Sequence, residues 1–154
     1  SKRSNVPGMR SGFVAGDEKI IKKFLLYRTY HGCAMAPPVQ TASVAAWNDE
    51  AHVLDNRNQY REKFAACTPL IAEVLGTRMP DASFYLWAKT PIADTEFARG
   101  LLEHYNVVVL PGSFLAREVN GINPGANFIR IALVASLAEC LEAASRIRQF
   151  AQQL

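Results

Sequence analysis

The sequence predicts an α/β fold, and three observations support this prediction. Residues 77–154 alternate apolar runs of strand length with stretches of helical length, in the order strand, helix, strand, strand, helix. Residues 17–75 place their apolar side chains at helical spacing. The chain has 154 residues, 49% of them hydrophobic and 20% charged, so it can bury a core without disulfides or a structural metal.

The first segment is rich in Ser, Gly, Pro and Arg, so residues 1–12 predict a loop. Residues 13–15 form a short apolar run that predicts a buried strand. Asp17 is a suitable N-cap for a helix that we expect to reach residue 30 and to end at Gly32. The apolar positions that follow helical spacing in it are Ile20, Ile21, Phe24 and Leu25.

Two further helices are predicted next in the chain. Prolines suit the first turn of a helix, so residues 37–48 predict a short helix that begins with two of them. Residues 49–75 predict one long amphipathic helix. Its inward positions alternate steps of four and three, at Val53, Arg57, Tyr60, Phe64, Cys67, Ile71 and Val74. We expect Pro69 to kink or break this helix, with Thr68 capping a second segment.

The remaining elements form a compact α/β unit. Strands are predicted at residues 84–89, 107–110 and 128–134, and helices at residues 95–105 and 137–153. Ser136 and Glu139 have the spacing of a capping box at the start of the last helix.

The long helix marks the boundary between two bodies. Residues 1–50 belong to one body, residues 51–76 form the linker helix, and residues 77–154 form a small α/β domain. The first body is incomplete, because one strand and two helices cannot cover both faces of a sheet. The sequence therefore predicts that this body has missing partners.

Charge and composition exclude several classes of protein. The net charge of +3 is spread along the chain, and Lys19, Lys22 and Lys23 alternate with apolar residues as on a solvated helix face, so nucleic-acid binding is not expected. The three histidines are far apart and predict no metal site. The three cysteines lack a CxxC pair, which predicts buried thiols, at Cys33 among others, in a reducing, cytoplasmic compartment. No apolar stretch predicts a membrane span.

The first twelve residues carry the most informative motif. Ser1 and Lys2 are followed by Gly8 and then by Arg10 and Gly12. This pattern resembles the signature of the class I aminotransferases, a fold-type I family that uses pyridoxal 5'-phosphate (PLP), although an aliphatic residue is commoner there between the arginine and the last glycine. The resemblance implies that the chain is the C-terminal portion of such a fold, with one strand and helices of the large domain.

The resemblance implies that Lys2 is the catalytic lysine, which holds PLP as a Schiff base. It also implies that Ser1 and Arg10 bind the cofactor, with Arg10 at the phosphate. The chemistry agrees, because lysine supplies an amine that binds the aldehyde and then moves a proton, and an arginine fork suits a dianionic phosphate. The alternative is that Lys2 and Arg10 are exposed charges on a flexible terminus.

A second arginine lies in the middle of an apolar strand. Arg130 must reach an anion or water there, because burying an unpaired guanidinium is very unfavourable. The resemblance implies that Arg130 binds the α-carboxylate of the substrate. The alternative is an edge strand in which Arg130 makes a structural ion pair.

Two further segments resemble parts of the family. Residues 110–114 look like the small-domain segment that turns toward the substrate, which implies that Phe114 lines the site; a core role is the alternative. Arg117 either meets a second acidic group of the substrate or is solvated.

Residues 27–32 and 36–40 resemble the N-succinyldiaminopimelate aminotransferases of bacterial lysine biosynthesis. In related enzymes this segment reaches the active site of the neighbouring subunit, which implies that His31 and Gly32 lie beside the partner's cofactor and substrate. His31 is otherwise a histidine at a helix end, where the helix dipole favours it.

The resemblance implies a homodimeric enzyme that transfers an amino group between an amino acid and 2-oxoglutarate. The resemblance covers about the last two fifths of a typical family member. The family residues that hold the pyridine ring come before the lysine, so the isolated fragment is expected to be inactive. One alternative is the PLP-sensing domain of a transcription regulator, and another is a PLP lyase or synthase.

Overall fold

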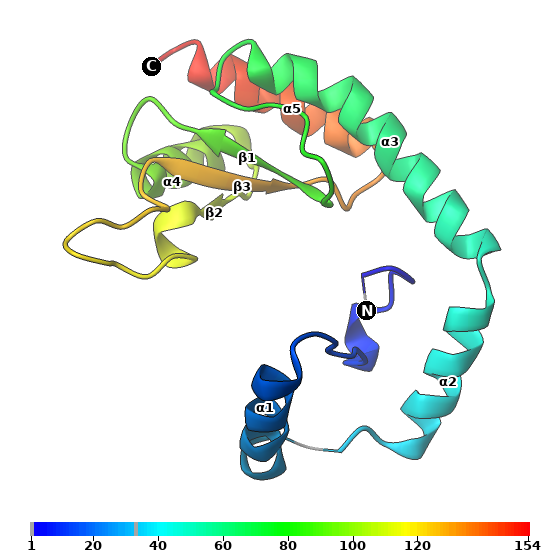
Figure 1. Cartoon of the computed structure of the whole chain (residues 1–154). Helices are drawn as coiled ribbons and strands as arrows, with labels where there is room; N and C mark the ends of the chain where they lie inside the picture. Colours follow the sequence, from blue (N-terminus) through cyan, green and yellow to red (C-terminus); the bar gives the residue numbers. More distant parts are fainter. Residues whose placement is uncertain (1, 33) are drawn as a thin grey trace. The chain divides into compact units, whose positions relative to one another are not determined.

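The computed structural model describes residues 2–32 and 34–154, so Ser1 and Cys33, with the roles predicted for them, lie outside the described residues. The chain forms two compact units, Ser1–Arg57 and Asn58–Leu154. Figure 1 shows the elements of both. The assignment of residues 1–50, 51–76 and 77–154 to domains of a larger enzyme stays a prediction.

The first unit contains a short 3-10 helix and three α-helices, the last of which continues into the second unit. They are η1 (Pro7–Met9), α1 (Glu18–His31), α2 (Pro37–Asn48) and the start of α3 (Ala51–Ala72). The predicted N-cap of α1 is confirmed, because the Asp17 carboxylate accepts the backbone N–H groups of Lys19 at 2.9 Å and Ile20 at 3.1 Å. The predicted bounds of α1 and α2 are correct to within one or two residues.

The predicted buried strand at residues 13–15 is wrong for this chain. These residues carry no regular structure, and 73% of the Phe13 side chain is exposed. A strand needs neighbouring backbone groups to pair with, and the described residues of this unit form no strand. Helix α1 buries none of its side chains, and Val53 is the one buried apolar residue in the described part of the unit. The apolar surface predicted to need partners is therefore uncovered.

The second unit is built on a three-stranded antiparallel sheet. Its strands are β1 (Tyr85–Lys89), β2 (Leu110–Pro111) and β3 (Phe128–Ala132), in the order β1-β3-β2. Its helices are α4 (Asp94–Tyr105), η2 (Gly112–Phe114) and α5 (Leu137–Ala151), together with the second half of α3. The strand predicted at residues 107–110 is short and begins only at Leu110, after Asn106 ends α4 in the left-handed region at φ 52°.

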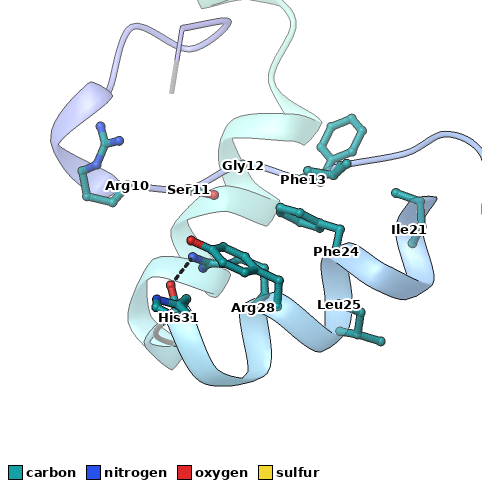
Figure 2. Close-up of a pocket in the computed structure, with 11 residues that line it drawn as sticks. Arg10, Ser11, Gly12, Phe13, Ile21, Phe24, Leu25, Arg28 and His31 are labelled. Carbon is teal, nitrogen blue, oxygen red and sulfur yellow. Dashed lines mark hydrogen bonds between the residues drawn. The ribbon is translucent and has the colours of Figure 1, made fainter. Parts of the chain in front are cut away.

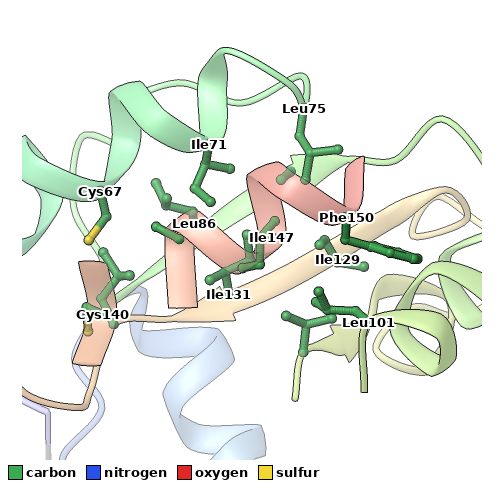
Figure 3. Close-up of a cluster of buried hydrophobic side chains, with 14 of the residues drawn as sticks. Cys67, Ile71, Leu75, Leu86, Leu101, Ile129, Ile131, Cys140, Ile147 and Phe150 are labelled. Carbon is green, nitrogen blue, oxygen red and sulfur yellow. The ribbon is translucent and has the colours of Figure 1, made fainter. Parts of the chain in front are cut away.

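The core of this unit lies on one face of the sheet. Alternate residues of the central and outer strands, Leu86, Ala88, Ile129 and Ile131, are buried against α3, α4 and α5 (Figure 3). Burial of one such leucine or isoleucine stabilises the fold by about 1.5–3 kcal/mol. The residues between these buried positions point to the other side of the sheet and form its outer face. They are Tyr85, Trp87 and Lys89 on β1 and Phe128 and Arg130 on β3.

The capping box predicted for α5 is confirmed. The Ser136 hydroxyl accepts the Glu139 backbone N–H at 3.3 Å, and the Glu139 carboxylate accepts the Ser136 N–H at 2.9 Å. Inside this helix Phe150 packs over Gly100 of α4, where an added Cβ would come within 2.8 Å of the ring. The capping box thus fixes the start of the helix, and the glycine permits its close packing on α4.

Helix α3 runs through Pro69 without a break, so the predicted break is wrong, and the predicted kink stays a prediction. The Thr68 hydroxyl is buried and finds no hydrogen-bond partner in the described residues, so it does not cap a second segment. Cys67 and Ile71, on either side of the proline, are fully buried in the core (Figure 3). Packing of the helix on the second unit therefore outweighs the local preference of proline for a helix end.

Two thiols of the second unit are buried, as predicted. Burial, with the neighbouring Cys140 adding to it, raises the pKa of the Cys67 thiol to about 11. Burial likewise raises the pKa of Cys140. Both are therefore protonated at neutral pH and are poor nucleophiles.

Among the helices in the described ranges, none has the length and apolar content that crossing a membrane requires.

Candidate functional site

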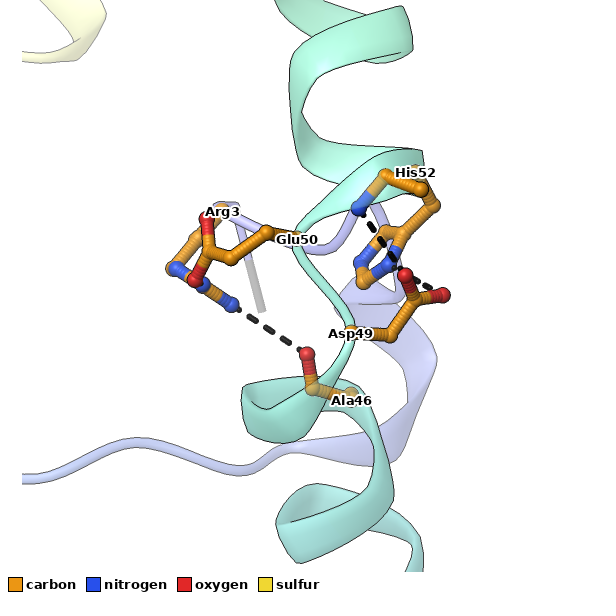
Figure 4. A network of polar contacts seen from close by, with 6 residues as sticks. Arg3, Ala46, Asp49, Glu50 and His52 are labelled. Atoms are coloured by element: carbon orange, nitrogen blue, oxygen red, sulfur yellow. Dashed lines mark hydrogen bonds and ion pairs between the residues drawn. The ribbon is translucent and has the colours of Figure 1, made fainter.

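Lys2 lies at the start of a turn, and the next residue, Arg3, holds this turn against α2. The Lys2 side chain is exposed, and its carbonyl accepts the backbone N–H of Asn5 at 3.4 Å. Arg3 donates to the carbonyl of Ala46 at 3.2 Å and makes an ion pair with Glu50 (Figure 4). Its guanidinium also lies 4.6 Å from the centre of the Trp47 ring. Arg3 therefore fixes the backbone from which Lys2 projects.

Sequence reasoning missed the role of Arg3. Its position directly after the lysine was the only signal, and an arginine in a polar loop gives no indication of its partner. Next to Glu50, the partner of Arg3, the ends of α2 and α3 are joined by a hydrogen bond between His52 Nδ1 and the Asp49 carboxylate at 2.9 Å (Figure 4). The hydrogen bond from His52 is the main reason why the pKa of Asp49 is lowered.

Arg10 ends η1 in the left-handed region, at φ 52° and ψ 36°. Its guanidinium is exposed and donates to the carbonyl of Pro7 at 2.8 Å. This bond uses one of the five N–H donors of the guanidinium. Neither Gly8 nor Gly12 would meet another atom of the chain within 4 Å if it carried a Cβ, so packing within this chain does not require a glycine at either position.

Arg10 and His31 line one open hollow of about 850 Å³ in the first unit (Figure 2). Arg28 lies between them in the lining, and its guanidinium donates to the His31 carbonyl at 3.5 Å. The Tyr27 ring stacks on His31, with 4.8 Å between ring centres. Two arginines and a histidine line the hollow, and no acidic side chain is among its described lining residues. This set of donors suits an anionic group such as a phosphate.

Gly32 follows α1 with an extended backbone, and an added Cβ would overlap the Arg28 guanidinium at 2.2 Å. The missing side chain thus leaves space for Arg28. His31 is the last residue of α1, as its alternative interpretation predicted. Lys2 is not among the residues that line this hollow.

Arg130 occupies the middle of the central strand in the second unit. It pairs with Trp87 on one side and with Leu110 on the other, so the alternative of an edge strand is wrong. Its guanidinium lies 5.4 Å from the Tyr85 ring centre, its Nε is buried without a hydrogen-bond partner, and it forms no ion pair with any residue that the structure describes. A buried unsatisfied guanidinium N–H is costly, so the arrangement suits an incoming anion.

Phe114 ends η2 and is 72% exposed, so the alternative of a core residue is wrong. Its predicted contact with substrate stays a prediction. Arg117 is exposed as well.

Asp94 is a buried carboxylate that the sequence did not single out. Only 4% of it is exposed, and it accepts the backbone N–H groups of Ser113 at 2.9 Å and Asn127 at 3.2 Å. Burial alone would raise the pKa of Asp94, but hydrogen bonding with the Ser113 side chain and with the backbone of Ser113 and Asn127 outweighs burial and lowers it. Asp94 thus joins η2 to the start of β3, the two elements that carry Phe114 and Arg130.

Comparison with known proteins identifies the family. The family model described as aminotransferase class I and II matches residues 1–147. The chain therefore belongs to the class I and II aminotransferases, a family of PLP-dependent enzymes.

A probable aminotransferase of Mycobacterium tuberculosis is 33% identical over 96% of this chain and 34% of its own length. The crystal structure of an aminotransferase from Neisseria meningitidis matches with 57% identity and a TM-score of 0.83, over 97% of this chain and 38% of that one. A probable N-succinyldiaminopimelate aminotransferase from Thermus thermophilus matches with 32% identity and a TM-score of 0.79, over 97% and 40%. The chain thus spans roughly a third to two fifths of the length of these relatives, and the predicted fold, a C-terminal portion of fold-type I, is confirmed.

Proposed function

We propose that the full-length protein is a PLP-dependent aminotransferase that moves an amino group between an amino acid and 2-oxoglutarate. The observation that carries this proposal is the state of Arg130, a guanidinium on the central strand with a buried and unsatisfied N–H group. An α-carboxylate satisfies such a group through two parallel hydrogen bonds. The family match, which begins at the first residue and so includes Lys2 and Arg10, supports the same reading.

Each candidate site residue has a distinct task in this proposal. PLP, when bound, supplies the electron sink that stabilises negative charge at the α-carbon of the substrate. Lys2 would hold the cofactor through Nζ, and the same amine would move the proton of the substrate's α-carbon. Arg10 binds the phosphate with Ser1 beside it, and Arg130 orients the substrate through its carboxylate.

The finer proposal is that the substrate is N-succinyl-2-amino-6-oxopimelate, with glutamate as the amino donor. The motif at residues 27–32 and the likeness to the Thermus thermophilus structure support it. In this proposal the enzyme is a homodimer, and His31 and Gly32 lie at the partner's cofactor and substrate. Phe114 contacts the substrate from the small domain, for which its exposure leaves it available.

Covalent labelling tests the central role of Lys2. The full-length protein is loaded with PLP, reduced with borohydride and digested, and the labelled peptide is identified by mass spectrometry. We expect the label on Lys2, and we expect Lys2→Arg to lose both the label and amino transfer from glutamate. Lys22→Arg, on the exposed face of α1, serves as the control and should keep both. A label on another lysine would overturn the proposal.

The 154-residue chain alone is expected to be inactive, because it spans at most two fifths of its relatives. Addition of PLP and glutamate to this chain tests this expectation. Sustained production of 2-oxoglutarate in the presence of an oxo-acid acceptor would contradict it.

A further inference from the structure

A second hollow, of about 540 Å³, opens beside the outer face of the sheet in the second unit. It is formed by the segment that joins α3 to β1 and by two side chains of β1 itself. The residues important here are Arg78, Asp81, Tyr85 and Trp87. Its volume lies within the range of about 300–1,000 Å³ that is usual for small-molecule sites.

Trp87 is a fixed aromatic wall of this hollow. It lies directly opposite Arg130 in the sheet register, and its ring stacks on Phe128 with 5.6 Å between centres and 12° between planes. On another side an added Cβ at Gly112 would come within 2.8 Å of the indole, so the backbone of η2 closes against it. The indole is held by these contacts and is still 37% exposed. It therefore offers a rigid apolar surface next to Arg130.

Tyr85 connects the hollow to Arg130. Its ring lines the hollow and also lies 5.4 Å from the Arg130 guanidinium. Tyr85, Trp87 and Arg130 share the outer face of the sheet, because side chains alternate along a strand and the register pairs Trp87 with Arg130. A molecule held at Arg130 by its carboxylate thus has an aromatic path into the hollow.

Arg78 supplies a second cation on this path. It is exposed, and within the described part of the chain its guanidinium makes no hydrogen bond or ion pair. Asp81 lines the same hollow and opposes its charge. An arginine without a partner on the wall of a ligand-sized hollow suits a carboxylate, which its planar fork binds through two hydrogen bonds.

We propose that this hollow receives the substrate side chain and that Arg78 selects amino acids whose long side chain ends in a second carboxylate. The proposal rests on the proposed function, in which Arg130 binds the α-carboxylate. Trp87 contacts the hydrocarbon part of the side chain between the two arginines. Asp81 weakens binding of the second carboxylate by repulsion.

The test compares two amino donors of equal chain length in the full-length, PLP-loaded enzyme. 2-Aminopimelate ends in a carboxylate, and 2-aminoheptanoate ends in a methyl group. Arg78→Gln should lower kcat/KM for 2-aminopimelate by about tenfold to a hundredfold, because a hydrogen bond to a charged group is lost, and should leave 2-aminoheptanoate within about twofold. Asp81→Asn should raise the preference for 2-aminopimelate, and Trp87→Leu should lower kcat/KM for both donors.

Arg99→Gln is the matched control, because Arg99 is an exposed arginine of the same unit outside this hollow, and it should change neither donor. Calorimetric binding of pimelate, compared with heptanoate, gives a second measurement that does not depend on turnover. Equal effects of Arg78→Gln on both donors, or no effect on either, would overturn the proposal even if Lys2 carries the borohydride label. Loss of the label from Lys2 in the unmodified enzyme would remove the proposed function and this inference with it.

Discussion

At the scale of single residues, Asp94 shows how hydrogen bonds from distant parts of the chain can stabilise a buried charge. Its carboxylate accepts two N–H groups from segments far apart in sequence, Ser113 and Asn127. Without the carboxylate these two donors would remain in a partly buried region with no acceptor. Asp94 is therefore expected to stabilise the second unit and to keep η2 and β3 in place.

Replacing Asp94 with Ala should lower the free energy of unfolding by about 1–3 kcal/mol, because buried donors lose their acceptor. The pKa of Asp94 is lowered in the folded state, so its contribution is present above the unfolded pKa and is lost as the pH falls below about 4. Urea unfolding of the full-length protein at pH 7 and at acid pH measures both effects.

The control for Asp94 is Glu96→Ala, in the same first turn of α4 but exposed, which should cost less than about 1 kcal/mol. Equal destabilisation by the two variants, or an acid sensitivity that survives Asp94→Ala, would show that the two hydrogen bonds contribute little.

The sequence singled out Lys2 and Arg10 through their motif, and Arg130 through the conflict between its charge and its surroundings. Arg130 is conspicuous because an apolar strand surrounds it, whereas Asp94 and Arg3 are ordinary polar residues in their local sequence. Their importance depends on acceptors and donors at least 19 residues away, such as Ser113 for Asp94 and Ala46 for Arg3. Trp87 and Arg78 likewise become informative only once the strand register is known.

At the scale of elements, helices were predicted well because their hydrogen bonds and caps are local. Asp17 and Ser136 each begin a helix where the sequence indicated. Strands depend on distant partners, so residues 13–15 and 107–109 lie outside any strand. Pro69 shows the opposite case, in which tertiary packing overrides a strong local signal.

Pro69→Ala should raise the free energy of unfolding by up to about 3 kcal/mol, because alanine restores a backbone N–H inside α3 and removes the ring. Chemical denaturation of the full-length protein measures the change. Pro37→Ala is the matched control, since Pro37 opens α2 where no helical N–H is lost, and it should have a small or unfavourable effect. Destabilisation by Pro69→Ala would instead mean that the core is shaped around the proline.

At the scale of the whole molecule, the two units differ in how much they bury. The second unit has a continuous core, whereas the described part of the first buries one apolar side chain, Val53. Helix α1 exposes apolar residues on several sides, which agrees with the sequence prediction of missing partners. The first unit should accordingly be the less stable of the two when the 154-residue chain is studied alone.

Hydrogen exchange measured by mass spectrometry tests this difference. In the 154-residue chain, the amides of α1 should exchange much faster than those of α5, because stability against opening follows buried contacts. In the full-length protein, the amides of α1 should become protected. Equal protection of α1 and α5 in the isolated chain would show that the first unit is stable by itself.

The order β1-β3-β2 also has a consequence for synthesis of the protein. The central strand, Phe128–Ala132, is the last of the three to be made, and the other two strands pair with it and not with each other. Until the ribosome has added residues 128–132, β3 does not exist. The sheet cannot form before then, and the apolar side chains of β1 and β2 stay unburied. The sheet therefore closes late in synthesis, and until then the apolar residues of β1 and β2 are open to aggregation.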